Sequence, residues 1–117
     1  MSWHNIGSLN DLVKNSGVCA LVNEQQIAVF FIPDTPNEVY AIGNYDPIGK
    51  ANVLSRGIVG SQGEKLVVAS PLYKQHFCLD TGECLQDTAM SVPSYSTKIE
   101  QGCVFIHSQP NLVTSVA

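Results

Sequence analysis

The residues that could do chemistry in this chain are mainly four cysteines and three histidines. Among them, His76, Cys78 and Cys84 lie near one another in the sequence, and no Cys-x-x-Cys pair is present. A zinc ion needs three or four such ligands. His76 and Cys78 lie two residues apart in an expected strand, so their side chains share one face without the paired loops that hold a metal. We therefore expect no metal site.

The four cysteines, Cys19, Cys78, Cys84 and Cys103, are expected to be free and buried. The first residues, Met1-Ser2-Trp3-His4-Asn5, contain neither the basic run nor the apolar stretch of a secretory signal. Disulfides are rare in proteins that stay in a reducing compartment, and a free cysteine usually packs as a small apolar side chain. These observations indicate a cytoplasmic protein.

The candidate catalytic residues lack the partners that catalysis needs. Asp46 could act as a general acid and Tyr73 as a proton donor, but the sequence offers no nucleophile with an adjacent base. Ser70 lacks the Gly-x-Ser-x-Gly context of a nucleophile elbow. Asp46 precedes Pro47, and an Asp-Pro pair favours a turn. We expect Asp46 and Ser70 to be turn residues, and we expect no catalytic site.

Two segments carry a pattern that points to a family. Residues 46–57 read Asp-Pro-Ile-Gly-Lys-Ala-Asn-Val-Leu-Ser-Arg-Gly, and residues 70–83 read Ser-Pro-Leu-Tyr-Lys-Gln-His-Phe-Cys-Leu-Asp-Thr-Gly-Glu. They resemble the two cluster-binding loops of Rieske proteins. In that family the first loop reads Cys-Pro-His and ends in Leu-Ser-x-Gly, and the second reads Cys-Pro-x-His and ends in Phe-x-Leu-x-Thr-Gly-Glu. The prolines and the ends of both loops match.

The four ligand positions of the family do not match. Asp46 and Ser70 stand where the family has its cysteines, and Ile48 and Tyr73 stand where it has its histidines. A Rieske centre needs two thiolates on one iron and two imidazoles on the other, whereas Ile48 has no donor atom at all. The resemblance therefore implies a Rieske-like domain that has lost its iron–sulfur cluster.

Over nearly its whole length the chain is similar to the small subunit of assimilatory NAD(P)H nitrite reductases. The similarity is carried by residues 3–6, 17–21, 26–30, 39–42, 44–47, 53–57 and 68–72. It implies an accessory subunit of an oxidoreductase that reduces nitrite to ammonium in nitrate assimilation. It also implies a large partner subunit that carries FAD, sirohaem and a 4Fe-4S cluster, whereas this chain would hold no cofactor and no active site.

Two other functions stay open. A Rieske-type ferredoxin would transfer electrons, which the missing ligands argue against. An independent ligand-binding β domain or small enzyme would need a pocket with convergent polar groups, which a sequence does not reveal.

The loop tips are the expected docking surface, because loops on a rigid scaffold often carry recognition. The candidate docking residues are Lys50, Arg56, Leu72, Tyr73 and Lys74. We also expect the side chains of Ile48, Leu72 and Tyr73 to pack together and fill the space that a cluster would occupy.

The composition is typical of one small globular domain. The chain has 117 residues, of which 44% are hydrophobic and 14% are charged, and its net charge is −4 at pH 7. Six Lys and Arg residues are too few for the cationic surface that nucleic acids require. The longest apolar run, residues 27–32, is far shorter than the roughly 20 residues of a membrane-spanning helix. We expect neither nucleic acid nor membrane as a partner.

The spacing of apolar residues predicts an all-β, antiparallel sandwich or barrel, and the resemblance makes it Rieske-like. Expected strands are residues 18–22, 26–32, 39–42, 57–59, 65–69 and 75–79, followed by a hairpin of 95–100 with 103–107. Ser8 and Asp11 resemble the capping box of one short helix. We expect one domain over residues 1–108, with a cluster-loop-like subdomain at about 44–83 and a flexible tail at 109–117.

Overall fold

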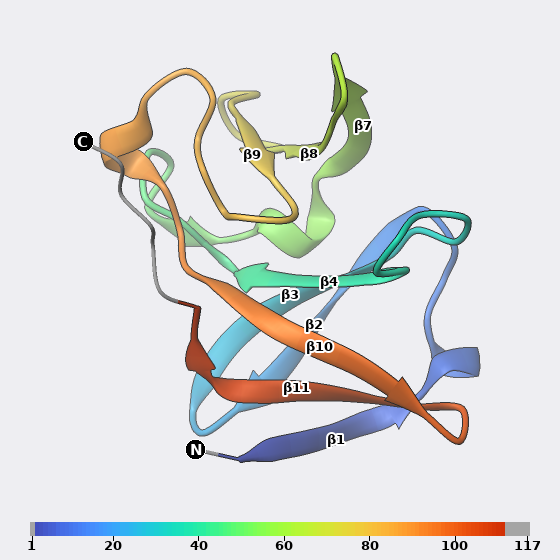
Figure 1. Cartoon of the computed structure of the whole chain (residues 1–117). Coiled ribbons are helices and arrows are strands. Elements are labelled where there is room, and N and C mark those ends of the chain that lie inside the picture. Colours follow the sequence, from blue (N-terminus) through green and yellow to red (C-terminus); the bar gives the residue numbers. More distant parts are fainter. Residues whose placement is uncertain (1, 112–117) are drawn as a thin grey trace.

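The structure, a computed structural model, describes residues 2–111 and has two parts, both built of antiparallel strands (Figure 1). The larger part is a curled six-stranded sheet with the strand order β1-β11-β10-β4-β3-β2. A three-stranded sheet, β7-β8-β9, lies above it in the view, and a two-stranded ribbon, β5-β6, completes the smaller part. The predicted all-β, antiparallel class is confirmed.

The strands of the larger sheet are β1 (Trp3–Ser8), β2 (Ser16–Val22), β3 (Gln25–Phe31), β4 (Val39–Gly43), β10 (Ser94–Glu100) and β11 (Cys103–Pro110). Those of the smaller part are β5 (Tyr45–Asp46), β6 (Ala51–Asn52), β7 (Ile58–Gln62), β8 (Lys65–Ala69) and β9 (His76–Cys78). The helical elements are single 3-10 turns, η1 (Leu9–Asp11), η2 (Leu54–Arg56) and η3 (Thr88–Met90). In residues 2–111, no helix is long and apolar enough to cross a membrane.

The predicted short helix after Ser8 is a single turn, and its capping box is confirmed. The Ser8 hydroxyl accepts from the Asn10 N–H at 3.1 Å, and the Asp11 carboxylate accepts from the Ser8 N–H at 3.2 Å. The turn stops there because Leu12 already has an extended backbone. A run this short gains no further helical hydrogen bonds to offset the cost of nucleation.

Both ends of the domain are more ordered than the sequence predicted. β1 was not predicted, and it pairs with β11 so that Trp3 lies opposite His107. β11 continues to Pro110, two residues past the expected domain end, and the N–H of Asn111 donates to the Ser94 carbonyl at 2.8 Å. The rest of the expected tail, residues 112–117, lies outside the described residues. The division into domain and tail otherwise stays a prediction.

β3 is buried on both faces and so separates two apolar clusters. Its side chains alternate, as in any strand: Ala28 and Phe30 pack with Phe77 of the smaller part, whereas Ile27 and Val29 pack inside the curled sheet. This explains why β3 reads as one continuous apolar run in the sequence. The first cluster joins the two parts of the molecule, so it fixes where the loops of the smaller part lie.

The cysteines are free, as predicted, but only two of the four are buried. Cys78 and Cys84 are buried, Cys19 is exposed and Cys103 is partly exposed. Cys19 and Cys103 lie on strands whose alternate residues face outward. A small apolar side chain is tolerated on such a face, so the expectation of burial was wrong for these two.

After β9 the chain returns to the larger sheet through a tight turn at Gly82. Gly82 has a φ of 81°, as the tight turn over residues 80–83 requires. Its N–H donates to the Cys78 carbonyl at 2.7 Å, and its carbonyl accepts from the Val92 N–H at 2.9 Å. A Cβ atom at this position would clash with the Val92 carbonyl oxygen. The turn therefore packs directly against the segment that leads into β10.

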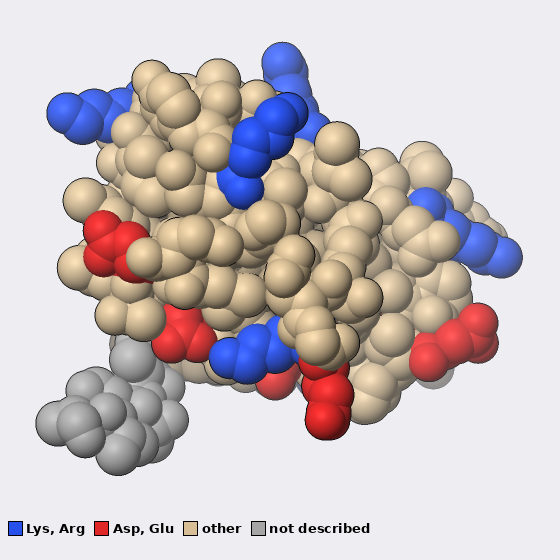
Figure 2. Space-filling view, turned by 90° about the horizontal axis from the view of Figure 1, so that it is seen from above, with Lys and Arg blue, Asp and Glu red and all other residues tan. Residues whose placement is uncertain are grey.

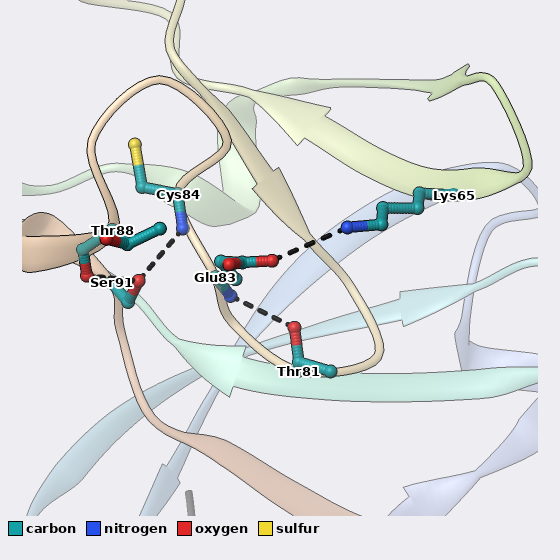
Figure 3. Close-up of polar contacts among 6 residues, drawn as sticks. All are labelled: Lys65, Thr81, Glu83, Cys84, Thr88 and Ser91. Carbon is teal, nitrogen blue, oxygen red and sulfur yellow. Dashed lines mark hydrogen bonds and ion pairs between the residues drawn. The ribbon is translucent and has the colours of Figure 1, made fainter. Parts of the chain in front are cut away.

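Side chains hold the same segment in place (Figure 3). The Ser91 hydroxyl accepts from the Cys84 N–H at 3.0 Å and donates to the Thr88 carbonyl at 2.8 Å. Lys65 approaches Glu83, with 3.5 Å between Nζ and Oε1, but both side chains are largely exposed, so this ion pair contributes little to stability. The sulfur of Cys84 points away from these polar contacts.

We predict that Gly82→Ala lowers the free energy of unfolding by about 3 kcal/mol, because it adds both a steric clash and an unfavourable positive φ. Gly63→Ala is the matched control. Gly63 has a φ of 62° with open space around it, so only the backbone cost of about 1 kcal/mol is expected. Urea unfolding measures both values, and equal losses for the two variants would contradict the packing argument.

Candidate functional site

The two loops that match the family pattern lie side by side in the smaller part of the molecule. The Ser70 hydroxyl donates to Oδ2 of Asp46 at 2.5 Å, and both residues are fully buried. The residues at the two expected cysteine positions are therefore in direct contact. Sequence reasoning placed both residues in turns but did not predict this bond.

Asp46 and Ser70 also organise their own loops. Oδ1 of Asp46 accepts from the N–H groups of Ile48 at 2.8 Å and Gly49 at 3.0 Å. The Ser70 hydroxyl accepts from the N–H of Leu72 at 3.3 Å. A buried carboxylate needs such donors in place of water. The prediction that both residues shape turns is confirmed, and the Asp46 carboxylate has three donors.

The two loops repeat the same backbone turn. The Asp46 carbonyl accepts from the Lys50 N–H at 2.7 Å, and the Ser70 carbonyl accepts from the Lys74 N–H at 3.0 Å. Lys50 and Lys74 both adopt positive φ angles, 59° and 68°. Each lysine thus occupies the same place in its turn, four residues after one member of the Asp46–Ser70 pair.

The expected packing of Ile48, Leu72 and Tyr73 into one cluster was wrong. Ile48 packs against the buried cluster between the two parts of the molecule. Leu72 lies so close to Gly49 that a Cβ there would clash, yet its side chain is 45% exposed. Tyr73 is 63% exposed. The contact between the two loops is instead made by the Asp46–Ser70 pair.

The residues at the ligand positions do not fit an iron–sulfur cluster. Ile48 has no donor atom, and the oxygens of Asp46 and Ser70 bind each other and the N–H groups of the loops. Thiolates and imidazoles are what such a cluster requires. Within residues 2–111, no group of three or more His, Cys, Asp or Glu side chains could hold a metal ion.

Asn44 connects the first loop to the larger sheet, and sequence reasoning missed it. Its side-chain amide donates to Oε1 of Gln26 at 3.2 Å, and its Oδ1 accepts from the Ser55 N–H at 2.7 Å. It is buried, so each of these bonds replaces a lost contact with water. The sequence feature that could have indicated Asn44 is its position, because it is a single amide residue directly after the apolar strand β4.

The five predicted docking residues, Lys50, Arg56, Leu72, Tyr73 and Lys74, are all exposed. Residues 47–75 contain four of the six cations and only one acidic residue, which gives this segment a charge of +3 although the whole chain carries −4. Figure 2 views the molecule from above, and in the upper third of this view every charged side chain is Lys or Arg. Acidic side chains appear mostly in the lower half. On this face, the charged side chains at the upper edge are therefore all cationic, whereas both signs occur below it.

A hollow of about 350 Å³ lies beside the first loop, next to Tyr45 and Pro47. Its polar lining includes Tyr95, whose hydroxyl donates to Oε1 of Gln25 at 3.0 Å. Burial raises the pKa of the Tyr95 phenol, so the phenol stays protonated near neutral pH. The residues that line this hollow include no nucleophile with an adjacent base.

Breaking the hydrogen bond between the loops should destabilise the domain. We expect Ser70→Ala to lower the free energy of unfolding by about 2 kcal/mol, and Asp46→Ala by about 3 kcal/mol because three donors lose their acceptor. The double variant should lose less than the sum, since both changes remove the same bond. Urea unfolding of the four proteins measures this coupling.

Ser61→Ala serves as the control, because Ser61 is exposed on β7 and the change should cost less than about 0.5 kcal/mol. If the losses of Asp46→Ala and Ser70→Ala simply add, the two side chains do not depend on each other, and the prediction is wrong.

Comparison with known proteins identifies the fold and gives close relatives. The Rieske-like [2Fe-2S] domain family matches residues 2–107. The nitrite reductase (NADH) small subunit of Salmonella typhimurium is 42% identical over 102 residues, which cover 87% of this chain and 94% of that protein. The solution NMR structure of the nitrite reductase [NAD(P)H] small subunit from Erwinia carotovora superposes with a TM-score of 0.75 at 49% identity, covering 98% of this chain and 91% of that one.

A much longer relative contains the same domain. The nitrite reductase [NAD(P)H] large subunit of Klebsiella oxytoca is 36% identical over 115 residues, which are 98% of this chain but only 12% of that protein. In that protein, a domain similar to this whole chain is therefore joined covalently to a large additional polypeptide.

Proposed function

This chain belongs to the family of nitrite reductase (NADH) small subunits, which share the Rieske-like domain, and we propose from this that it docks to and supports a large nitrite reductase subunit. The chain is the small accessory subunit of an oxidoreductase, and in the proposal the large subunit performs the reduction of nitrite to ammonium with electrons from NAD(P)H. Because NAD(P)H is consumed inside the cell, we place the complex in the cytoplasm.

One observation carries the proposal: the Klebsiella oxytoca large subunit contains a copy of this domain within its own chain. A covalent link keeps two domains at a high effective concentration relative to each other, so that a contact between them forms readily. Two separate chains can reach the same arrangement through a specific interface. A large nitrite reductase subunit is therefore the partner that best fits a free-standing copy of the domain.

The proposed contribution of this chain is structural. Its loops keep their shape through the Asp46–Ser70 pair, and its ligand positions offer no donor set for a cluster. We assign FAD, sirohaem and the 4Fe-4S cluster to the large subunit and no cofactor to this chain. The alternative of a Rieske-type electron carrier would need two thiolates and two imidazoles, which the residues at these positions do not supply.

The chain, purified without oxygen exposure, should contain neither iron nor acid-labile sulfide in stoichiometric amounts, because the ligand positions lack thiolates and imidazoles. Elemental analysis and visible absorbance measure this directly. About two irons per chain, with the absorbance of a [2Fe-2S] centre, would instead support the electron-carrier function.

Mixing the full chain with its purified large subunit should yield one complex and raise the rate of NAD(P)H-dependent nitrite consumption above that of the large subunit alone. Size-exclusion chromatography and a nitrite assay measure the two effects. Urea-unfolded chain, diluted into the same assay, is the control for nonspecific protein effects. Separate elution together with an unchanged rate would overturn the proposed function.

A further inference from the structure

We propose that Lys50 and Lys74, together with the exposed side chains of Leu72 and Tyr73, form the surface that binds the large subunit. The partner surface would be an apolar patch with an acidic rim. This inference rests on the proposed function and adds to it the face that docks and the chemistry that it recognises.

The geometry of the loops presents the two lysines in a matched way. Lys50 and Lys74 close the same backbone turn in two adjacent loops, and the Asp46–Ser70 bond holds these loops together. Among the described residues, neither lysine forms an ion pair, whereas Lys65 and Lys98 each pair with a glutamate. Both ammonium groups are therefore available to an external partner.

Charge complementarity selects an acidic partner surface. The segment 47–75 carries a charge of +3, while the rest of the chain is strongly acidic. A surface of this kind steers an acidic partner toward one end of the molecule and repels it from the others. The loops are consequently the face that a negatively charged surface of the partner would bind.

The apolar part of the surface lies beside the two lysines. Leu72 is 45% exposed and Tyr73 is 63% exposed. Burying either side chain against a partner would lower the free energy, because apolar surface would be removed from water. Tyrosine is enriched among residues that dominate binding energies. Leu72 packs against Gly49, and this contact restricts its side chain before binding. A rigid apolar surface loses little entropy on association.

A second exposed aromatic group, on the larger sheet, is less suited to docking because it is already engaged. Nζ of Lys98 lies 4.6 Å from the centre of the Trp3 ring, and 3.5 Å from a carboxylate oxygen of Glu100. The Trp3 ring also contacts His107 edge-on, with 5.0 Å between ring centres. The Lys98 ammonium group and the face of the Trp3 ring therefore already interact with each other within the chain.

The positive φ angles allow a test that spares the fold. Glycine adopts these angles without strain, so K50G/K74G removes two charges and should leave the thermal midpoint unchanged or raise it. Surface plasmon resonance with the immobilised large-subunit holoenzyme would measure binding of the full chain. We expect an association rate constant about tenfold lower at low salt, and a difference that disappears at high salt, where charges are screened.

The apolar contact has its own matched pair of variants. Tyr73→Ser should raise the dissociation rate constant about tenfold, because most losses of contact affect dissociation. Leu21→Ser is the control, since Leu21 is 70% exposed but lies on β2 of the larger sheet. Lys14→Gln is the corresponding control for charge, because Lys14 is exposed and precedes β2, outside the loops. Both controls should bind like the unmodified chain.

The possible outcomes distinguish failure of the proposed docking surface from failure of the proposed function. If the unmodified chain binds and both K50G/K74G and Tyr73→Ser bind equally well, another face docks and this inference is overturned, while the proposed function stands. If the controls weaken binding as much as the loop variants do, the inference is also overturned. If the unmodified chain does not bind the large subunit at all, the proposed function itself fails.

Discussion

A buried carboxylate has to be surrounded by hydrogen-bond donors, and this constraint on Asp46 shapes the functional end of the molecule. Its two oxygens receive one hydroxyl and two backbone N–H groups, which lie in two different loops. Removal from water would otherwise make the charge too costly to bury. Because the donors come from both loops, satisfying the carboxylate also fixes the loops relative to each other.

Other contacts fix the position of these two loops relative to the larger sheet. Asn44 ties the first loop to β3 through Gln26, and the Gly82 turn ties the end of the smaller sheet to the segment before β10. The apolar cluster around Phe77 fills the space between these two attachments. Hydrogen bonds and packing thus position the two loops of this Rieske-like domain.

The sequence predicted features that depend on neighbouring residues and missed those that depend on distant ones. Short runs of β-branched and aromatic residues between turn signals located β2, β3, β4 and β8 to within a few residues. The assignment of Asp46, Ile48, Ser70 and Tyr73 to altered ligand positions stays an interpretation of the loop pattern. β1 was missed because its pairing partner is about a hundred residues away. The bond between Asp46 and Ser70 joins residues 24 apart, and Tyr73 is largely exposed. Neither could be read from local spacing.

The loop pair also has a consequence for protein design. Changing either Asp46 or Ser70 to cysteine would disrupt their hydrogen bond, yet it would supply only one of the four ligands that a Rieske cluster needs. Each of these two changes alone would therefore cost stability before a cluster could bind. Building such a centre into this chain would require changes at Asp46, Ile48, Ser70 and Tyr73 together, so the two loops would have to exchange one means of attachment for another in a single step.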